Sequence, residues 1–188
     1  MPGGVSSFED AVETAQRKLS LALEGPCEIS LHNGLDEGLI GAIEAIEREK
    51  FREELQYGSD ELASRGRMEG FMCLLVRLDG EPIAYDFGYN DDEEEGAFFS
   101  DSSATLIERR GIGSTLTALE AVYCYGSGYR AVKMTTEEED EAGRLLRNFW
   151  ERLGFRTVSS DPAEGTEMRL ELTRQAVRGL SDKYIGPF

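Results

Sequence analysis

Apolar residues recur at helical spacing in the first part of the chain. Their positions predict an amphipathic helix over 7–23. Residues 27–31 alternate between apolar and polar side chains and predict a short strand. A second helix is expected after Asp36, whose carboxylate can accept hydrogen bonds from the first helical turn. A third helix is expected over about 59–65, with Ser59 as its cap.

The period changes to that of strands between residues 71 and 103. The dense apolar run 71–78 and the alternating run 83–89 flank Asp79-Gly80, a pair typical of a tight hairpin turn. A third strand over 97–103 completes an antiparallel meander. Because side chains alternate along a strand, one face of the second strand is predicted to carry Ile83, Tyr85, Phe87 and Tyr89.

Helices and strands alternate from there to the end of the chain. The expected elements are a helix over 111–125, a strand over 130–135, a helix from Thr135 or Thr136 to Gly154, and strands over 155–158 and 166–172. The tail after Thr173 is either a short helix or disordered. This order predicts an α/β (α+β) fold with a mixed sheet.

The charge of the chain limits its partners. Asp and Glu number 37 against 20 Lys and Arg, which gives a formal net charge of −17. A broad nucleic-acid surface needs a basic face, and docking on anionic lipid needs the same, so both partners are excluded. A small anionic ligand in one local pocket stays compatible with this charge. The acidity fits a saline cytoplasm, and it equally fits Glu-rich helices and arginine-favouring codon usage.

The cysteines and the histidine bear on compartment and metal. Cys27, Cys73 and Cys124 are odd in number and form no CxxC pair, so a reducing cytoplasm is expected. His32 is the only histidine, and no metal site is expected. No apolar run approaches the roughly 18–20 residues that span a bilayer, and the first residues do not read as a signal peptide.

The segment Glu108–Ser114 carries the clearest chemistry. It joins a strand to a helix, and a helix start leaves several N–H groups without partners while its dipole favours negative charge. Gly111 and Gly113 let the backbone curl around a phosphate, and Arg109 and Arg110 add forked cationic donors. The alternative is a tight strand-to-helix turn that needs small residues for packing alone.

Two motifs in this order resemble the GNAT acyltransferase superfamily. Its pattern (Arg/Gln)-x-x-Gly-x-(Gly/Ala) after the fourth strand falls on 108–113, and its later Leu-Tyr-Glu-Lys-Leu-Gly-Phe stretch resembles 149–155. The resemblance covers about 27–173, with an N-terminal helical extension over 1–26 and a C-terminal tail over 174–188. It implies a mostly antiparallel central sheet flanked by helices, with an extra N-terminal helix.

The resemblance also implies a co-substrate and where it binds. The loop would wrap the pyrophosphate of acetyl-CoA, the end of the preceding strand would pair with the pantetheine arm, and the fourth and fifth strands would splay apart to admit it. The implied cofactor-binding residues are Ser103, Ala104, Thr105, Arg109, Arg110, Gly111, Ile112, Gly113, Ser114, Phe149 and Trp150.

The activity implied by the resemblance is transfer of an acyl group, most simply acetyl, to a primary amine by direct attack. The acidic exterior favours a cationic acceptor, whether a small molecule or a peptide amine. A homodimer is compatible with the sequence. The rival interpretation is a binding or sensing module of the same fold that holds coenzyme A and transfers nothing.

The sequence departs from the family pattern at three positions. Glu108 stands where the pattern has Arg or Gln, Trp150 where a general-acid tyrosine is frequent, and Gly143 where Asn is common. Carboxylates are the candidates for a general base. Asp101 and Glu108 are the predicted catalytic residues, with Asp86 as a lesser candidate.

Two further features have two interpretations each. The aromatic face of Tyr85, Phe87 and Tyr89 either belongs to the core or lines an acceptor pocket. The acidic runs 91–95 and 137–141 either attract a cationic acceptor or form a solvated turn and the dipole-matched first turn of a helix.

Overall fold

A computed structural model describes residues 7–137, 145–161 and 165–186. Within these ranges the helices are α1 (Phe8–Leu23), α2 (Glu37–Lys50), α3 (Ser59–Arg65), α4 (Ile112–Gly126), α5 (Leu146–Arg152) and α6 (Arg174–Tyr184), with a 3-10 turn at Glu53–Leu55. The strands are β1 (Cys27–His32), β2 (Met72–Leu78), β3 (Glu81–Asn90), β4 (Ala97–Thr105), β5 (Ala131–Thr136), β6 (Arg156–Asp161) and β7 (Gly165–Glu171).

The described strands form one seven-stranded sheet in the order β1-β2-β3-β4-β5-β7-β6. Every neighbouring pair is antiparallel except β4 and β5, which run parallel. Asp79 and Gly80 both have positive φ, as a two-residue hairpin turn between β2 and β3 requires. The predicted mixed, mostly antiparallel sheet flanked by helices is confirmed.

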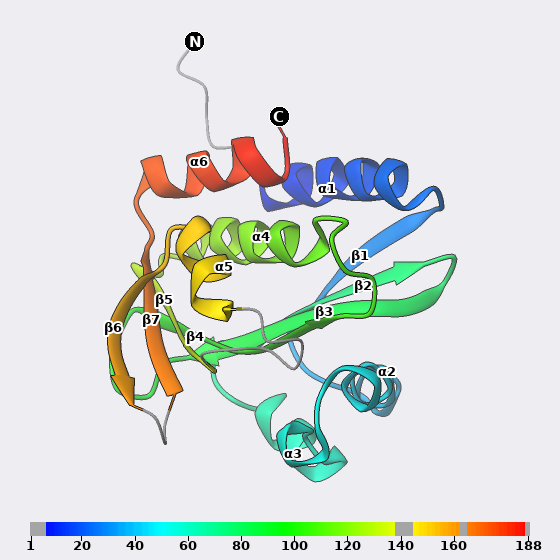
Figure 1. Ribbon diagram of the computed structural model, residues 1–188, viewed down its shortest axis with the longest axis horizontal. Coiled ribbons are helices and arrows are strands. Elements are labelled where there is room, and N and C mark those ends of the chain that lie inside the picture. The colour runs from blue at the N-terminus through cyan, green and yellow to red at the C-terminus, as the bar shows by residue number, and fades with distance from the viewer. Residues whose placement is uncertain (1–6, 138–144, 162–164, 187–188) are drawn as a thin grey trace.

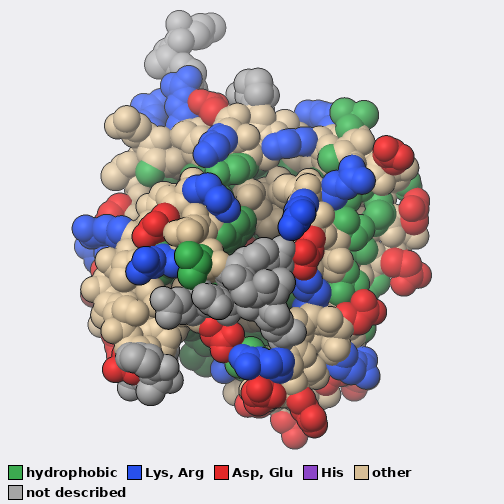
Figure 2. Space-filling view, viewed as in Figure 1, with side chains coloured by type: hydrophobic (Ala, Val, Ile, Leu, Met, Phe, Trp, Pro, Cys, Tyr) green, Lys and Arg blue, Asp and Glu red, His purple; other side chains and the backbone are tan. Residues whose placement is uncertain are grey.

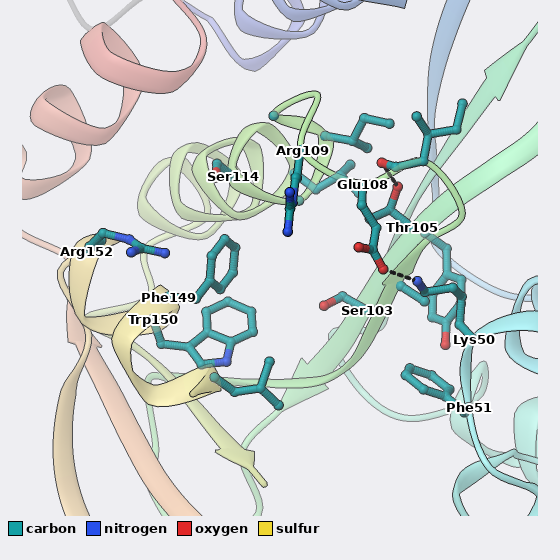
Figure 3. Close-up of a pocket in the computed structure, with 18 of the residues that line it drawn as sticks. Lys50, Phe51, Ser103, Thr105, Glu108, Arg109, Ser114, Phe149, Trp150 and Arg152 are labelled. Carbon is teal, nitrogen blue, oxygen red and sulfur yellow. Dashed lines mark hydrogen bonds and ion pairs between the residues drawn. The ribbon is translucent and has the colours of Figure 1, made fainter. Parts of the chain in front are cut away.

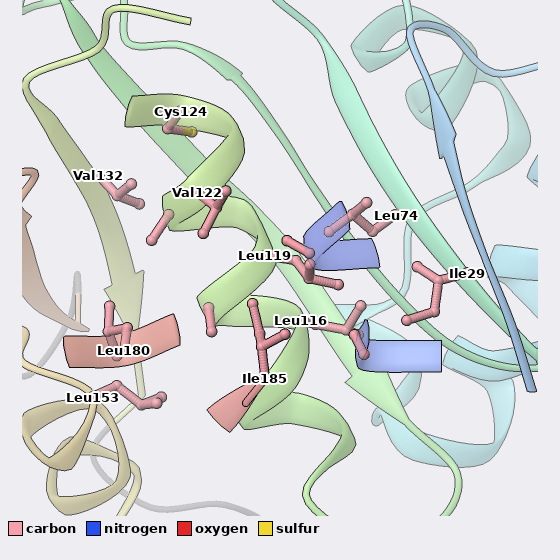
Figure 4. Close-up of a cluster of buried hydrophobic side chains, with 14 of the residues drawn as sticks. Ile29, Leu74, Leu116, Leu119, Val122, Cys124, Val132, Leu153, Leu180 and Ile185 are labelled. Carbon is pink, nitrogen blue, oxygen red and sulfur yellow. The ribbon is translucent and has the colours of Figure 1, made fainter. Parts of the chain in front are cut away.

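Two hydrophobic cores lie on opposite faces of this sheet. Helix α4 covers one face, and α1 and α6 close that first core from outside, whereas α2 and α3 cover the other face (Figure 1). The first core is drawn in Figure 4, with Leu116, Leu119 and Val122 of α4 packed among Ile29, Leu74, Val132, Leu180 and Ile185. Burial of each such side chain contributes about 1.5–3 kcal/mol.

The alternation predicted for β3 is wrong at one residue. The pairing of β2 with β3 slips at Ile83, which is an extra residue in a β-bulge. Ile83 packs into the first core, while Tyr85, Phe87 and Tyr89 face the second core as predicted. A bulge resets the alternation, so the period of two holds only on one side of it.

The helix caps are confirmed at one predicted position and corrected at another. Oδ1 of Asp36 accepts a hydrogen bond from the N–H of Leu39 at 2.8 Å, as expected of the cap of α2. Ser59 is the first residue of α3 and not its cap, which is Gly58. The Glu61 carboxylate accepts a hydrogen bond from the Gly58 N–H at 3.0 Å, so the side chain of the third helical residue satisfies that group.

The later helices also differ from prediction. Thr135 and Thr136 end β5, and the continuous helix predicted from there to Gly154 is wrong at Leu145, whose extended backbone precedes α5. The intervening residues 138–144 lie outside the described residues. Gly154 has a φ of +93° just past α5, as predicted.

The tail after Thr173 is helical. Thr173 caps α6 through a 3.1 Å hydrogen bond that its hydroxyl accepts from the Ala176 N–H, and the buried Val177 and Leu180 join the first core. Because α1 and α6 share this core with α4, both flanking helices are integral to the packing of the sheet. The division of the chain at residues 26 and 173 stays a prediction.

Candidate functional site

The parallel strands β4 and β5 separate soon after they start. They pair only over 97–99 and 131–133, so the second half of β4, from Ser100 to Thr105, has a free edge on its β5 side within the described residues. A cavity of about 520 Å³ opens beside this free edge, between the start of α4 and α5 (Figure 3). It is lined by Lys50, Phe51, Tyr85, Ser103, Ala104, Thr105, Ile107, Glu108, Arg109, Gly111, Ile112, Gly113, Ser114, Leu116, Leu145, Leu146, Phe149, Trp150 and Arg152.

The N-terminus of α4 opens into this cavity without a cap. Gly111 is its N-cap residue, with a φ of +81°, and it supplies no side chain to the first-turn N–H groups. No acidic residue lies in that first turn. By contrast, Ser7, Asp36 and Thr173 cap α1, α2 and α6 with side-chain oxygens. The N–H groups of α4 are therefore available to an anion in the cavity.

The lining of the cavity is cationic in an otherwise acidic chain. Among the described residues, Lys50, Arg109 and Arg152 line it against one acid, Glu108, although the whole chain has a net charge of −17. In Figure 2, several blue Lys and Arg side chains lie across the upper and middle part of this face with single red acids among them, and further acids lie along the right edge and at the bottom. Of the two predicted arginines only Arg109 lines the cavity. Arg110 donates a hydrogen bond to the Ala22 carbonyl oxygen at 3.2 Å.

Glu108 is paired with a lysine from the opposite wall of the cavity. Nζ of Lys50, at the end of α2, lies 2.6 Å from Oε1 of Glu108 (Figure 3). Both side chains are partly exposed. The acid that departs from the family pattern thus has its charge offset by a cation brought from another element.

Phe149 and Trp150 form the α5 wall of the cavity. Their rings pack edge to face with centroids 4.9 Å apart, and Trp150 also packs against Phe155 at 5.6 Å. A Cβ placed on Gly113 would lie 3.7 Å from the Phe149 ring. The α5 wall therefore packs close to the start of α4. The buried indole N–H of Trp150 has no hydrogen-bond partner among the described residues.

Asp101 occupies a β-bulge in β4. Phe87 pairs with Ser102 and Gly88 pairs with Ser100, which leaves Asp101 as the extra residue. A Cβ on Gly88 would collide with the carbonyl oxygen of Phe99, so only glycine allows this approach of the two strands.

The Asp101 carboxylate points to the α2–α3 side and has three partners. Its Oδ2 lies 2.8 Å from Nε of Arg65, and its oxygens accept hydrogen bonds from the hydroxyls of Tyr57 and Tyr89 at 2.9 and 3.1 Å. Its side chain is 7% exposed. Asp101 does not line the cavity beside the start of α4, and its role as a base stays a prediction.

A second carboxyl network lies beside Asp101, and the sequence analysis missed it. The hydroxyl of the fully buried Tyr85 donates to Oε1 of Glu47 at 2.8 Å and lies 2.8 Å from Oγ of Ser102. Glu47 is also fully buried, and its Oε2 accepts a hydrogen bond from the Tyr57 N–H at 2.8 Å. The available signal was the acid at position 47 directly beside Ile46 and four residues after Ile43, on the apolar face of the predicted helix.

Asp86 lies on the other face of the sheet, away from the cavity lining. It is 2% exposed, as is Glu120 of α4. Burial raises the pKa of Glu120, and the nearby Asp86 carboxyl raises it further. Ser100 donates a hydrogen bond to Oε2 of Glu120 at 3.3 Å. One oxygen of each carboxyl lacks a hydrogen-bond partner among the described residues.

The acidic run 91–95 is a structured turn. Oδ1 of Asp91 accepts hydrogen bonds from the N–H groups of Glu93 and Glu94 and lies 3.1 Å from Nζ of Lys133. Glu94 pairs with Arg169 of β7 through both oxygens, at 2.6 and 2.9 Å. Most of the second run, 138–141, lies outside the described residues, as does Gly143.

The described residues contain neither a helix suited to a membrane nor a cluster suited to a metal ion. None of their helices is both long and apolar enough to cross a membrane. No group of three or more His, Cys, Asp and Glu side chains in those same ranges is arranged to hold a metal ion.

Solved structures share this fold. The ribosomal-protein-S18-alanine N-acetyltransferase from Escherichia coli is 14% identical, with a TM-score of 0.62 over 77% of this chain and 94% of that chain. The aminoglycoside 6′-N-acetyltransferase from Enterococcus faecium is 13% identical, with a TM-score of 0.64 over 77% and 97%. The PaiA N-acetyltransferase from Thermoplasma acidophilum, solved with coenzyme A, is 13% identical, with a TM-score of 0.62 over 77% and 99%.

These likenesses show that the chain has the GNAT fold, as its motifs predicted. No protein-family model and no curated protein sequence matches the chain.

Proposed function

We propose that this chain, with its GNAT fold, binds acetyl-CoA in the cavity beside β4 and transfers the acetyl group to a primary amine. The observation that carries the proposal is the uncapped N-terminus of α4, which opens into a cation-lined cavity. A turn that needed small residues for packing alone would require neither the open N–H groups nor the cations.

The diphosphate of acetyl-CoA would lie against the N–H groups of Ile112, Gly113 and Ser114. The helix dipole and the Arg109 guanidinium favour negative charge there. Lys50 and Arg152 line the same cavity and supply further positive charge for phosphate oxygens. The cationic lining of this otherwise acidic protein thus complements the charge of a strongly anionic ligand.

The pantetheine arm would extend along the free edge of β4. Ser103, Ala104 and Thr105 line the cavity there, and the pantetheine amides can pair with their backbone groups as an added strand does. Phe149 and Trp150 would cover the arm on its other side. The unpartnered Trp150 N–H can donate one hydrogen bond to an oxygen or sulfur of the thioester region.

The transfer needs no covalent enzyme intermediate. The amine nitrogen forms a bond to the thioester carbonyl carbon, the carbon–sulfur bond breaks, and sulfur leaves with the electron pair. The protein orients the two reactants, polarises the carbonyl with a backbone N–H and accepts the amine proton. Asp101 and Glu108, predicted from the sequence, are the candidate carboxylates for this proton transfer.

The proposed acceptor is a cationic amine, held by a small molecule or a peptide. The chain is strongly acidic outside the cationic cavity, so its field favours the approach of a cation. The proposed compartment is the cytoplasm, since Cys27, Cys73 and Cys124 are buried free thiols.

The second candidate is a module that binds coenzyme A without transfer. The indole at Trp150 supports it, because an indole N–H does not release its proton to a leaving thiolate. One experiment separates the candidates: calorimetric titration with acetyl-CoA, followed by free-thiol release against a panel of amines. Absence of binding would overturn the cavity assignment, whereas binding without thiol release would favour the module.

A further inference from the structure

Glu47 is a buried acid that the proposed cofactor site does not use. It is fully buried on α2, and neither of its oxygens lies within ion-pair distance of a cation among the described residues. Its two hydrogen bonds come from the Tyr85 hydroxyl and the Tyr57 N–H. Burial raises the pKa of this carboxyl above its usual value. Such a group takes up a proton at a higher pH than an exposed glutamate does.

Tyr85 connects Glu47 to strand β4. Its hydroxyl lies 2.8 Å from both Oε1 of Glu47 and Oγ of Ser102, and its side chain borders the cavity. When the Tyr85 hydroxyl donates to Glu47, the Ser102 hydroxyl donates to Tyr85, and the Ser102 oxygen keeps its lone pairs to accept a hydrogen bond. Unlike Glu47 and Tyr85, Ser102 is only partly buried.

The β4 bulge decides where Ser102 points. Successive residues of a regular strand face opposite sides, but the extra residue Asp101 lets Asp101 and Ser102 both contact side chains of the α2–α3 side. Ser103, next along the strand, lines the cavity. The chain of hydroxyls therefore starts within the free edge of β4.

We propose that Ser102, Tyr85 and Glu47 form a relay that receives the proton of the acceptor amine during acyl transfer. This inference rests on the proposed function and assigns its proton acceptor. The amine approaches β4 from the α2–α3 side and donates a hydrogen bond to Ser102. Glu47 then acts through the two hydroxyls and does not touch the substrate.

The proton count closes in three transfers. The attacking nitrogen is the neutral amine, whose ammonium proton has already passed to water. As the carbon–nitrogen bond forms and the carbon–sulfur bond breaks, one further nitrogen proton passes to Oγ of Ser102. The Ser102 hydroxyl proton passes to Tyr85, and the Tyr85 hydroxyl proton passes to the Glu47 carboxylate. After the products leave, Glu47 returns its proton to solvent through the same hydroxyls, and the departing thiolate takes one from water.

The charged groups around Glu47 favour it over Asp101 as the proton acceptor. Glu44 on α2 and Asp101 on β4 are acids that raise the pKa of Glu47, while Tyr57 and Tyr85 donate hydrogen bonds that oppose this effect. Arg65 lies against Asp101, at 2.8 Å. Asp101 is thus held by a guanidinium and two tyrosine hydroxyls, whereas Glu47 has no cation within ion-pair distance among the described residues.

The test uses the full chain with Glu47→Gln, Tyr85→Phe and Ser102→Ala. Acetyl-CoA affinity is measured by calorimetry, and thiol release with one accepted amine is followed from pH 5 to 9. Each variant is expected to bind acetyl-CoA within about twofold of wild type and to lose about 100-fold in kcat. In wild type, kcat/KM falls as Glu47 protonates at acidic pH. Glu47→Gln should lack that acidic limb.

Matched controls separate proton transfer from packing. Glu49→Gln changes an exposed acid of the same helix, and Ser100→Ala removes a hydroxyl from the other face of β4. Both are expected to keep the wild-type pH profile. The Glu47→Gln/Tyr85→Phe double variant should be no slower than the slower single variant, since a broken relay cannot be broken twice.

Opposite results are distinguishable. If wild type turns over and the three variants keep its rate and acidic limb, the relay is wrong and the proposed function stands. If wild type binds acetyl-CoA but releases no thiol with any amine, acyl transfer and the relay both fall. Should Glu47→Gln not fold, Tyr85→Phe and Ser102→Ala decide the outcome.

Discussion

Nζ of Lys50 lies 2.6 Å from Oε1 of Glu108, and this ion pair joins the end of α2 to the loop that precedes α4. Both residues line the proposed acetyl-CoA cavity. An acid in a phosphate-binding loop repels its ligand unless a cation offsets it. Lys50 therefore allows Glu108 to stand where related sequence patterns place Arg or Gln.

Removal of Lys50 is expected to weaken acetyl-CoA binding. Lys50→Met leaves the Glu108 charge beside the phosphates, and affinity should fall about three- to tenfold at low salt, with a smaller loss at high salt. Glu108→Gln should bind as well as wild type or better, and the double variant should recover most of the loss. Calorimetry at two salt concentrations measures this. Arg48→Met removes a cation from the same helix outside the cavity and serves as control.

Gly111→Ala is expected to weaken acetyl-CoA binding beyond its effect on folding. At a φ of +81° an added Cβ meets no neighbour, so the cost is backbone strain of about 1 kcal/mol. Relief of that strain would turn the first N–H groups of α4, and affinity should fall at least about tenfold. Gly128→Ala at the far end of α4, with a φ of +92° and equal space, should lose similar stability and no affinity. If Gly111→Ala bound acetyl-CoA as tightly as Gly128→Ala and wild type do, the phosphates would bind elsewhere.

The Asp86 and Glu120 carboxyls are expected to make stability fall with rising pH. Burial raises the pKa of Asp86 to about 7 and raises that of Glu120 well above its usual range. The folded state thus binds protons more tightly than the unfolded chain. The stabilising contribution of Asp86 is complete below its unfolded pKa of about 4 and is lost as pH rises through about 7. The contribution of Glu120 is lost in the same direction.

Asp86→Asn should flatten this pH dependence. At pH 8 the amide removes one buried charge, so the free energy of unfolding is expected to exceed that of wild type by about 1–3 kcal/mol, with little difference at pH 5. Urea denaturation at both pH values measures it. Glu28→Gln, an exposed change on β1, is the control. A wild-type curve as flat as that of Asp86→Asn would contradict the assignment.

Asp101→Asn is expected to destabilise the fold because it breaks a largely buried ion pair. Arg65 would keep its charge without a carboxylate, and the loss should be about 2–4 kcal/mol in urea denaturation. Arg65→Met in the same chain should restore part of that loss. Turnover of the stable double variant then tests Asp101 separately: a fall of about 100-fold in kcat would support it as a base.

Most of the fold was predictable because its signals are local. The apolar period located α1 and α2, and Asp79-Gly80 located the β2–β3 hairpin, as the structure confirms. The errors occur where long-range packing overrides the period. Ile83 packs into the opposite core across a bulge, and the extended Leu145 interrupts a continuous apolar helix pattern.

The candidate site was predictable where it is one continuous segment. Arg109 and Gly111 to Ser114 could be found because strand, glycines and helix adjoin in sequence, and the structure places them around one cavity. The sequence could not show that the Arg110 side chain lies outside the cavity lining, because its hydrogen bond to the Ala22 carbonyl oxygen of α1 depends on the tertiary packing. Glu47 was overlooked because nothing beside it in sequence shows that a tyrosine hydroxyl will meet it.

The sequence by itself determined the glycine-containing segment before α4, the order of the elements and the acidity of the chain, because each depends on adjacent residues or on their sum. Only the tertiary structure decided the partners of the charges. Lys50 meets Glu108 across 58 positions, and Tyr85 meets Glu47 across 38. Such meetings follow from the packing of α2 against the sheet, and the β4 bulge at Asp101 sets the side on which Asp101 and Ser102 lie.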